Sequence, residues 1–299
     1  MMDFEKRLTE IAGAANVKLE EPMKNHTTFR IGGPARYFVT PENVDALILV
    51  IGLCRGEEKP FAVIGNGSNL LVSDQGYQGV VISTEKLDHC QVEGNQIRAE
   101  AGVKLARMAK QALEHGLAGL EFAAGIPGTV GGALVMNAGA YGSEMKNVLV
   151  DAVLLTKDGA VIRRTGEELE LGYRTSNIPI EGLTVLEAEV RLQLGDKTEI
   201  LRVMNDLAAK RREKQPLEYP SAGSTFKRPE GYFAGKLIDD AGLRGFQVGG
   251  AQVSEKHCGF VINRNQATAA DVEELCRQVA EKVKEQSGVD LEMEIKRLG

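Results

Sequence analysis

The sequence predicts an α+β protein with two or three domains, and three observations support this class. The chain has 299 residues, which is long enough to form several hydrophobic cores. Segments with helical and with strand patterns are interspersed along it. Near residue 200 the composition changes from many strands and two glycine-rich loops to a smaller part that mixes helices and strands. We therefore place the main boundary between Gly195 and Glu199.

The helices are expected from apolar periodicity and from residues that begin or end a helix. They lie at Glu42 to Gly56, Lys104 to His115, Glu199 to about Gln215 and Phe233 to Ala241. A last helix follows a capping box that runs from Thr268 to Asp271. Its periodicity places one set of apolar residues on a single face: Val272, Leu275, Cys276, Val279 and Val283.

Strands are expected where apolar and β-branched residues run or alternate between turn residues. They lie at Phe61 to Gly65, Leu70 to Val72, Val148 to Thr156, Ala160 to Arg164, Leu183 to Leu194, Gln252 to Asn263 and Leu291 to Leu298. In the last strand, alternation places Leu291, Met293 and Ile295 on one side. From the pattern alone, Glu294 is expected on a solvated face.

Composition excludes several classes of protein. Apolar residues make up 43% of the chain and charged residues 26%, which is typical of soluble globular proteins. The longest apolar stretch is far too short to cross a membrane, so no membrane insertion is expected. The segment Met1 to Arg7 has no apolar core of a signal peptide, so we expect a cytoplasmic protein. The net charge of −6 disfavours a nucleic-acid-binding surface.

Cysteine and histidine spacing predicts neither a disulfide framework nor a metal site. The four cysteines, Cys54, Cys90, Cys258 and Cys276, contain no C-x-x-C pair, and we expect free, buried thiols. The four histidines are scattered without clustered acids. We therefore expect no metal.

A run of eighteen residues from Gly125 to Gly142 contains six glycines and almost no charge. A flexible linker would carry polar residues, whereas this run carries Ile126, Val130 and Leu134, which favour burial. Buried glycine-rich turns present backbone N–H groups that suit phosphate or a flat polar ring. A tight turn in a core without a ligand explains the run equally well.

A second glycine-rich loop, Gly65 to Asn69, connects two expected strands. A Rossmann loop would need a third glycine where Leu70 stands, and a helix where Ser73 to Gly76 breaks the chain. The dinucleotide fold of that type is therefore disfavoured. A strand–loop–strand cradle for a diphosphate remains open.

Three polar segments are poorly explained by a purely structural role. Arg174 lies between an aromatic and small polar residues and can offer a guanidinium to a carboxylate, although it could also cap a turn. Ser224 is surrounded by small residues that leave its hydroxyl open, with Lys227 nearby. The pattern G-x-S-x-G of a hydrolase is absent. The third segment contains Glu294. The cationic run Lys210 to Arg212 is expected to be a solvated helix end.

Taken together and in this order, the motifs resemble the UDP-N-acetylenolpyruvoylglucosamine reductase family. The resemblance extends from Asn25 to Gly299. It is carried by Gly65–Asn69, Gly125–Gly128, Asn137–Gly142, Tyr173–Arg174, Ala222–Lys227 and Glu294. Each motif is modest, but the ordered set is specific.

The resemblance implies an FAD-binding domain of the vanillyl-alcohol-oxidase type, built of two α+β subdomains, and a C-terminal α+β substrate domain. The subdomains are expected at residues 1–84 and 85–197, and the substrate domain at residues 198–290. The strand 291–299 is expected to return to the first subdomain. The length resembles the compact type of the family, which lacks an extra substrate-covering loop.

The resemblance also implies roles for particular residues. Arg174, Ser224 and Glu294 match the catalytic residues. Tyr173, Lys214, Lys227 and His257 match substrate-binding positions. The residues expected to bind FAD are Gly65, Asn66, Gly67, Ser68, Asn69, Leu70, Gly125, Ile126, Pro127, Gly128, Gly131, Gly132, Asn137, Ala138, Gly139 and Ala140.

The implied reaction uses NADPH and bound FAD to reduce UDP-N-acetylglucosamine enolpyruvate to UDP-N-acetylmuramate, a precursor of peptidoglycan. Hydride reaches C3 of the enol ether, Arg174 stabilises the charge that develops beside C2 with Glu294 as a hydrogen-bond partner, and Ser224 delivers the proton. No obligate protein partner is implied. The alternatives are a sugar or alcohol oxidase on the same scaffold, and a flavin- or nucleotide-binding protein without turnover.

Overall fold

The structure is a computed structural model that describes residues 4–299. Residues 1–3, the start of the segment examined for a signal peptide, lie outside the described residues. Contacts divide the chain into two compact units. The first takes residues 1–19, 37–66 and 79–211, and the second takes residues 20–36, 67–78 and 212–299. Within residues 4–299, no helix combines the length and the hydropathy needed to cross a membrane.

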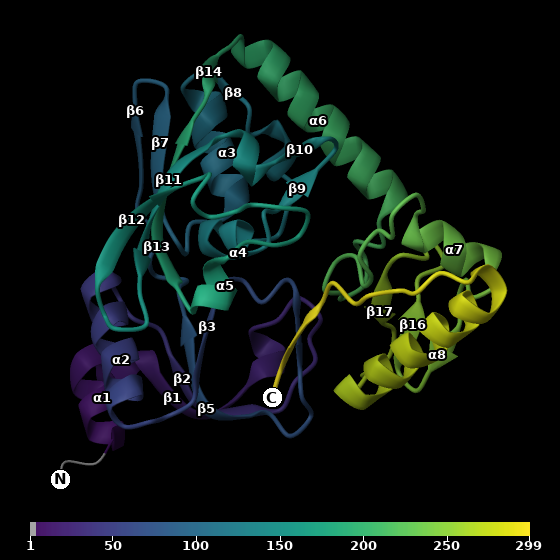
Figure 1. Cartoon of the computed structure of the whole chain (residues 1–299), viewed down its shortest axis with the longest axis horizontal. Helices are drawn as coiled ribbons and strands as arrows, with labels where there is room; N and C mark the ends of the chain where they lie inside the picture. Colours follow the sequence, from purple (N-terminus) through teal and green to yellow (C-terminus); the bar gives the residue numbers. More distant parts are fainter. Residues whose placement is uncertain (1–3) are drawn as a thin grey trace. The chain divides into compact units, whose positions relative to one another are not determined.

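Helices and strands both occur along the described chain (Figure 1), and most of the strand pairs are antiparallel, which is typical of the α+β class. The helices are α1 (Phe4–Ala12), α2 (Val44–Gly56), α3 (Leu105–Glu114), α4 (Val130–Val135), α5 (Ile178–Glu181), α6 (Lys197–Lys214), α7 (Ala234–Asp240) and α8 (Ala269–Ser287). The strands before residue 120 are β1 (Val17–Pro22), β2 (Pro34–Val39), β3 (Phe61–Ile64), β4 (Leu70–Val72), β5 (Tyr77–Ser83), β6 (Cys90–Glu93), β7 (Gln96–Glu100) and β8 (Leu117–Ala118). Those after it are β9 (Gly139–Ala140), β10 (Ser143–Glu144), β11 (Leu149–Leu155), β12 (Val161–Thr165), β13 (Thr184–Arg191), β14 (Gln193–Leu194), β15 (Gln247–Val248), β16 (Ala251–Val253), β17 (Val261–Asn263) and β18 (Lys296–Leu298).

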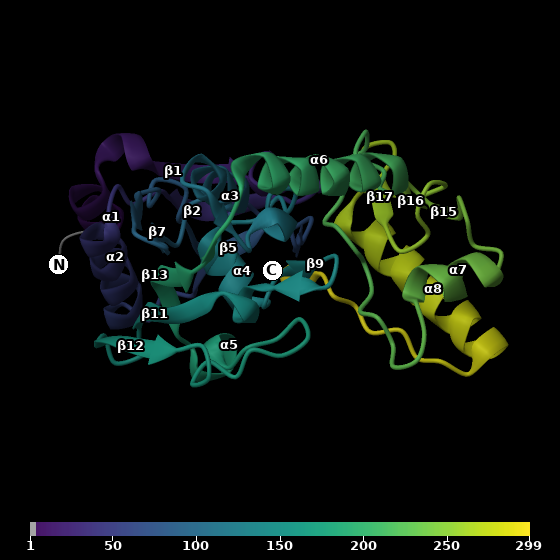
Figure 2. The ribbon, with the colours of Figure 1, turned by 90° about the horizontal axis from the view of Figure 1, so that it is seen from above.

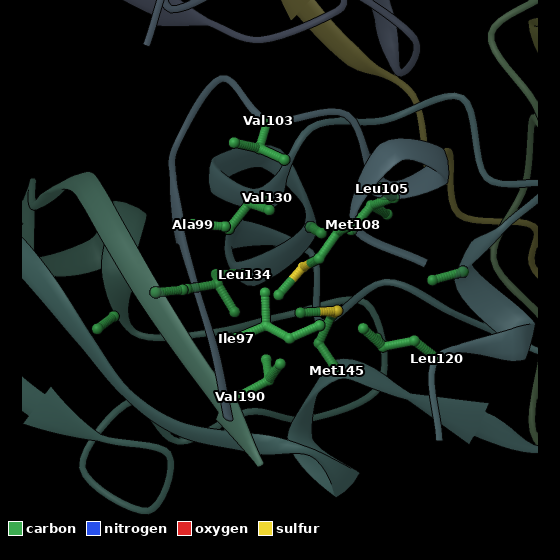
Figure 3. Packing of buried hydrophobic residues seen from close by; sticks show 14 of the residues in the cluster. Ile97, Ala99, Val103, Leu105, Met108, Leu120, Val130, Leu134, Met145 and Val190 are labelled. Carbon is green, nitrogen blue, oxygen red and sulfur yellow. The ribbon is translucent and has the colours of Figure 1, made fainter. Parts of the chain in front are cut away.

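The first unit contains an antiparallel sheet with strand order β12-β11-β13-β7-β6. Alternation gives this sheet an apolar and a charged face. On the apolar face, Ile97 and Val190 pack with α3 and α4 around one core (Figure 3). On the charged face, Arg98 pairs with Glu187 and Glu189. The apolar face therefore fixes α4, the helix that continues the glycine-rich run.

A separate core in the first unit lies under α1 and α2, which are side by side in both views (Figures 1 and 2). Leu8 of α1 and Leu47 and Ile51 of α2 are completely buried against Val80 and Ile82 of β5. The strand β5 belongs to a four-stranded sheet of order β1-β2-β5-β3. Strand β3 pairs with β5 in parallel and ends at Ile64, directly before the loop that begins at Gly65.

The second unit packs α7 and α8 around a three-stranded sheet of order β15-β16-β17. The predicted capping box of α8 is present, because Thr268 Oγ1 accepts a hydrogen bond from the N–H of Asp271. The five apolar residues expected on one face of this helix are all buried. The same core contains Leu71 of β4 and Ile295 near the end of the chain.

The structure corrects two expected strands. Gln252 to Asn263 is a hairpin, β16 and β17, rather than one strand. Ser254 Oγ accepts hydrogen bonds from the N–H groups of Lys256 and His257, which turns the chain. Leu291 to Leu298 forms a strand only at β18, preceded by a single bridge between Met293 and Phe226.

Candidate functional site

Gly65 and Asn66, which begin one glycine-rich loop, contact the other glycine-rich loop within the first unit. The amide Nδ2 of Asn66 donates a hydrogen bond to the carbonyl of Pro127 at 2.7 Å. A Cβ placed on Gly65 would lie 2.1 Å from Thr129 Oγ1, so only glycine allows this approach. The C-terminal end of β3 and the N-terminal end of α4 therefore hold the two loops in contact.

Packing explains several glycines of the run without any ligand. The N–H of Gly131 donates to the carbonyl of Ala101 at 2.9 Å, and a Cβ on Gly131 would lie 3.1 Å from the Cβ of Ala101. A Cβ on Gly139 would lie 2.6 Å from the Cβ of Glu144. At these positions the tight-turn interpretation of the sequence is sufficient.

Two further observations fit a bound anionic cofactor at these loops. Thr129 Oγ1 is buried without a hydrogen-bond partner in the described part of the chain. Between residues 4 and 299, the N–H group of Asn66 likewise finds no protein acceptor. Because polar groups held in place without protein partners favour a ligand, these donors suit a diphosphate.

Asn137 connects the glycine-rich run to the segment that carries Arg174. Its side chain is completely buried, and Nδ2 donates to Glu144 Oε2 at 3.0 Å and to the carbonyl of Gly172 at 2.9 Å. Its Oδ1 accepts from the N–H of Lys146 at 3.0 Å. The amide is therefore fully used inside the protein, which favours a positioning role over direct contact with a cofactor.

Arg174 lies in a tight turn closed by a bridge between Gly172 and Thr175. Its φ of 55° is in the left-handed region, which is uncommon for a residue with a side chain. The guanidinium Nη2 donates to the carbonyl of Gly139 at 3.1 Å. The Cζ atom of the guanidinium lies 5.4 Å from the ring centre of Tyr173, whose side chain is exposed. The turn thus presents a cation beside the glycine-rich run.

In the second unit, main-chain pairing places Thr225, the residue after Ser224, opposite Glu294. The N–H of Glu294 donates to the carbonyl of Thr225 at 2.9 Å, and the N–H of Lys227 donates to the carbonyl of Glu292 at 2.8 Å. Thr225 itself is buried, and its Oγ1 accepts from the N–H of Val261. Ser224 is half-buried, and its hydroxyl has no hydrogen-bond partner among residues 4–299. The open hydroxyl expected from the sequence is therefore observed.

The end of the chain is fixed to the loop that precedes β4. Asn69 Nδ2 donates to the carbonyl of Glu294 at 3.3 Å, and the carbonyl of Asn69 accepts from the N–H of Lys296. Strand β18 then pairs with β4 in parallel, with Lys296 opposite Leu70. Glu294 is half-buried, so the solvated face expected from alternation is wrong for this residue.

The predicted substrate-binding residues of the second unit have different surroundings. Lys227 forms an ion pair with Glu292, while Lys214 is exposed. His257 Nδ1 accepts from the N–H of Gly259 at 3.1 Å, which places its proton on Nε2. Burial, together with the nearby charges of Arg244 and Lys214, lowers the pKa of His257. This imidazole is a neutral hydrogen-bond donor.

One arginine was missed by sequence reasoning. Arg211 was assigned to a solvated helix end, but its side chain is half-buried in the first unit against Gly125. Its neighbours Lys210 and Arg212 are exposed, as expected. Nothing in the local sequence distinguishes the three residues, because the burial of Arg211 depends on a loop far away in the chain.

The surroundings of the cysteines determine the reactivity of their thiols. All four cysteines are free, and Cys54, Cys258 and Cys276 are buried while Cys90 is half-buried. Burial raises the pKa of the Cys54 thiol to about 11 and that of Cys276 to about 12, so neither is a reactive thiolate at neutral pH. Among the described residues, no three His, Cys, Asp or Glu side chains are grouped to hold a metal ion.

Comparisons with known proteins cover nearly the whole chain. Residues 35–165 match the family model of an FAD binding domain, and residues 215–298 match that of the UDP-N-acetylenolpyruvoylglucosamine reductase C-terminal domain. The reductase of that name from Agathobacter rectalis is 53% identical, with 99% of this chain and 98% of the relative aligned. The one from Clostridium kluyveri is 49% identical, over 99% and 98% of the two chains.

Solved structures agree with these relatives. The crystal structure of UDP-N-acetylenolpyruvylglucosamine reductase from Thermus caldophilus has a TM-score of 0.81 and 38% identity, covering 95% of this chain and 98% of that one. Phl p 4, a grass pollen allergen with glucose dehydrogenase activity, has a TM-score of 0.51 at 15% identity, covering 65% of this chain and 45% of its own. This second likeness shows the fold alone.

Proposed function

The chain belongs to the UDP-N-acetylenolpyruvoylglucosamine reductase family, and from this we propose that it reduces UDP-N-acetylglucosamine enolpyruvate to UDP-N-acetylmuramate with NADPH. The single observation that carries the proposal is the identity of about half the residues to reductases of that name over 99% of this chain. The protein is an FAD-dependent oxidoreductase of peptidoglycan precursor synthesis. We place the reaction in the cytoplasm, with no obligate protein partner.

FAD, when bound, supplies the two-electron carrier between NADPH and the enol ether. Its diphosphate is proposed to lie at the two glycine-rich loops, where Thr129 Oγ1 and the N–H group of Asn66 have no protein partner in the described chain. We propose that the other residues named from the resemblance, including Leu70 and Gly132, make the remaining contacts with FAD. Asn137 and Asn69 hold the surrounding main chain.

The chain's own side chains act on the substrate. Reduction places hydride on C3 of the enol ether, and the resulting negative charge at C2 spreads into the adjacent carboxylate. Arg174 is proposed to stabilise this charge together with Glu294, an effect of a few kcal/mol for each well-placed group. Ser224 is proposed to donate the proton to C2. A hydroxyl is a weak acid, but the carbanion is a much stronger base, so the transfer is downhill.

Four residues are proposed to bind the rest of the substrate. Lys214 and Lys227 offer positive charge to the diphosphate, Tyr173 offers an exposed ring, and the neutral His257 donates from Nε2. The ion pair of Lys227 with Glu292 makes its contribution the weakest, because its charge is already shared. We also propose the domain division expected from the sequence, with boundaries after residues 84, 197 and 290.

An anaerobic visible spectrum of the purified protein tests the proposal. NADPH should bleach the flavin band, and added UDP-N-acetylglucosamine enolpyruvate should restore it. Bleaching that the substrate does not reverse would instead support a different oxidoreductase on the same fold, such as an oxidase. A colourless protein that takes up no FAD would contradict the assignment of both glycine-rich loops.

A further inference from the structure

Arg211 is a half-buried cation at the C-terminal end of α6. A Cβ placed on Gly125 would lie 2.9 Å from Arg211 Nε and 3.4 Å from its Cζ, so the guanidinium packs directly on the main chain of Gly125. This contact explains why glycine occupies position 125. It also places a positive charge against the first residue of the Gly125–Gly128 turn.

The guanidinium has one polar partner in the described chain, the hydroxyl of Tyr141. No carboxylate among residues 4–299 forms an ion pair with it. Burial lowers the pKa of Arg211, which means that its surroundings disfavour the charge. Other arginines of this protein form ion pairs with acidic residues at the surface, for example Arg202 and Arg277. Arg211 therefore lacks the counter-charge that a partly buried guanidinium needs.

A bound anion would supply that charge. Arginine binds phosphate oxygens in a planar, often bidentate geometry, and a neutral phenol can donate a further hydrogen bond to the same group. Arg211 lies outside both matched segments, which end at residue 165 and begin at residue 215. Neither family model therefore covers this residue.

We propose that Arg211, supported by Tyr141, binds a phosphate oxygen of a diphosphate ligand at the Gly125–Gly128 turn. The inference rests on the proposed function, in which FAD and the UDP-sugar each carry a diphosphate. The shared chemistry is the diphosphate, and the experiment below separates the two sources.

The test compares Arg211→Met with Arg211→Lys, and uses Lys210→Met as the matched control because Lys210 is an exposed neighbour. Dissociation constants are measured for FAD on the apoprotein by flavin fluorescence, and for UDP on the FAD-loaded protein by calorimetry. Arg211→Met should weaken one of these two affinities at least tenfold, and Arg211→Lys should weaken it less. Lys210→Met should leave both within twofold.

The ligand that loses affinity identifies the source of the diphosphate. The thermal midpoint of the apoprotein distinguishes binding from a structural role, since Arg211→Met removes an uncompensated charge and should leave the midpoint unchanged or higher. Tyr141→Phe provides a milder second variant, expected to weaken the same ligand by a few-fold. Unchanged affinities for both ligands in Arg211→Met would overturn the proposal. Neither binding measurement requires turnover, so a protein that fails to reduce the enolpyruvyl sugar can still show the effect.

Discussion

Asn137 donates a hydrogen bond from Nδ2 to the carbonyl of Gly172 at 2.9 Å, two residues before Arg174. The same amide holds Glu144, whose strand β10 pairs with β9, and β9 supplies the Gly139 carbonyl that accepts from Arg174. One buried side chain therefore connects both segments that set the position of this guanidinium. Asn137 is a positioning residue in this arrangement.

Asn137→Asp should separate the two half-reactions. The carboxylate keeps the acceptor for the N–H of Lys146 but loses both donors and faces Glu144, so the turn around Arg174 should shift. A displacement of about 1 Å can lower a rate by about 100-fold. We expect a loss of this size in substrate-dependent reoxidation of the flavin, measured by stopped flow, with reduction by NADPH changed only a few-fold.

A matched control for this experiment is Asn95→Asp, whose amide also donates to a main-chain carbonyl, that of Leu192, in the same unit. It should leave both rates near those of the wild type. Equal losses in both half-reactions of Asn137→Asp would contradict the positioning role and indicate a general loss of structure.

Asp74 stabilises the second unit by capping α8. Its two carboxylate oxygens accept from the N–H groups of Ala269 at 2.8 Å and Ala270 at 3.0 Å. Asp74→Ala should lower the free energy of unfolding by about 1–2 kcal/mol, the usual effect of losing a helix cap. Chemical denaturation measures this, with Glu285→Ala as the control, since Glu285 is exposed on the same helix. Equal midpoints for the two variants would show that the cap contributes nothing.

His257 makes stability depend on pH in a defined direction. Burial lowers its pKa from the ordinary value of 6.5, so as pH falls through about 6.5 the unfolded chain takes up a proton that the folded chain does not. The free energy of unfolding should therefore decrease below this pH, until the folded imidazole also titrates. His257→Gln removes this titrating group. As the pH falls from 7 to 5, the free energy of unfolding of the variant should therefore rise relative to that of the wild type. A difference that stays constant over this range would argue against a neutral, buried His257.

The fold was predictable where the information was local. Helix α8 has its capping box and its apolar face within one stretch of sequence, and both are observed. The hairpin of β16 and β17 was missed because its apolar residues resemble one continuous strand. The turn depends on the side chain of Ser254 and on a hydrogen bond between its N–H and the carbonyl of Phe260.

The site residues named from the resemblance stay predictions, and their arrangement in space could not be derived from the sequence. Resemblance indicated Ser224 and Glu294, yet the pairing of the two segments that carry them joins parts of the chain about 70 residues apart, which no local pattern records. The burial of Arg211 against Gly125 has the same non-local origin. Sequence alternation therefore placed Glu294 in solvent, and the cationic run at the end of a helix placed Arg211 there.

We propose that Ser224 acts only on the substrate, and the variant Ser224→Ala is the test of this role. Ser221 is the control, because its side chain has no proposed role. Single-turnover stopped flow under anaerobic conditions measures reduction by NADPH and reoxidation by UDP-N-acetylglucosamine enolpyruvate. We expect normal reduction and a loss of reoxidation by about 10²–10⁴-fold in Ser224→Ala, the range for losing a general acid, with Ser221→Ala unaffected. Reoxidation of Ser224→Ala near the wild-type rate would show that another group donates the proton.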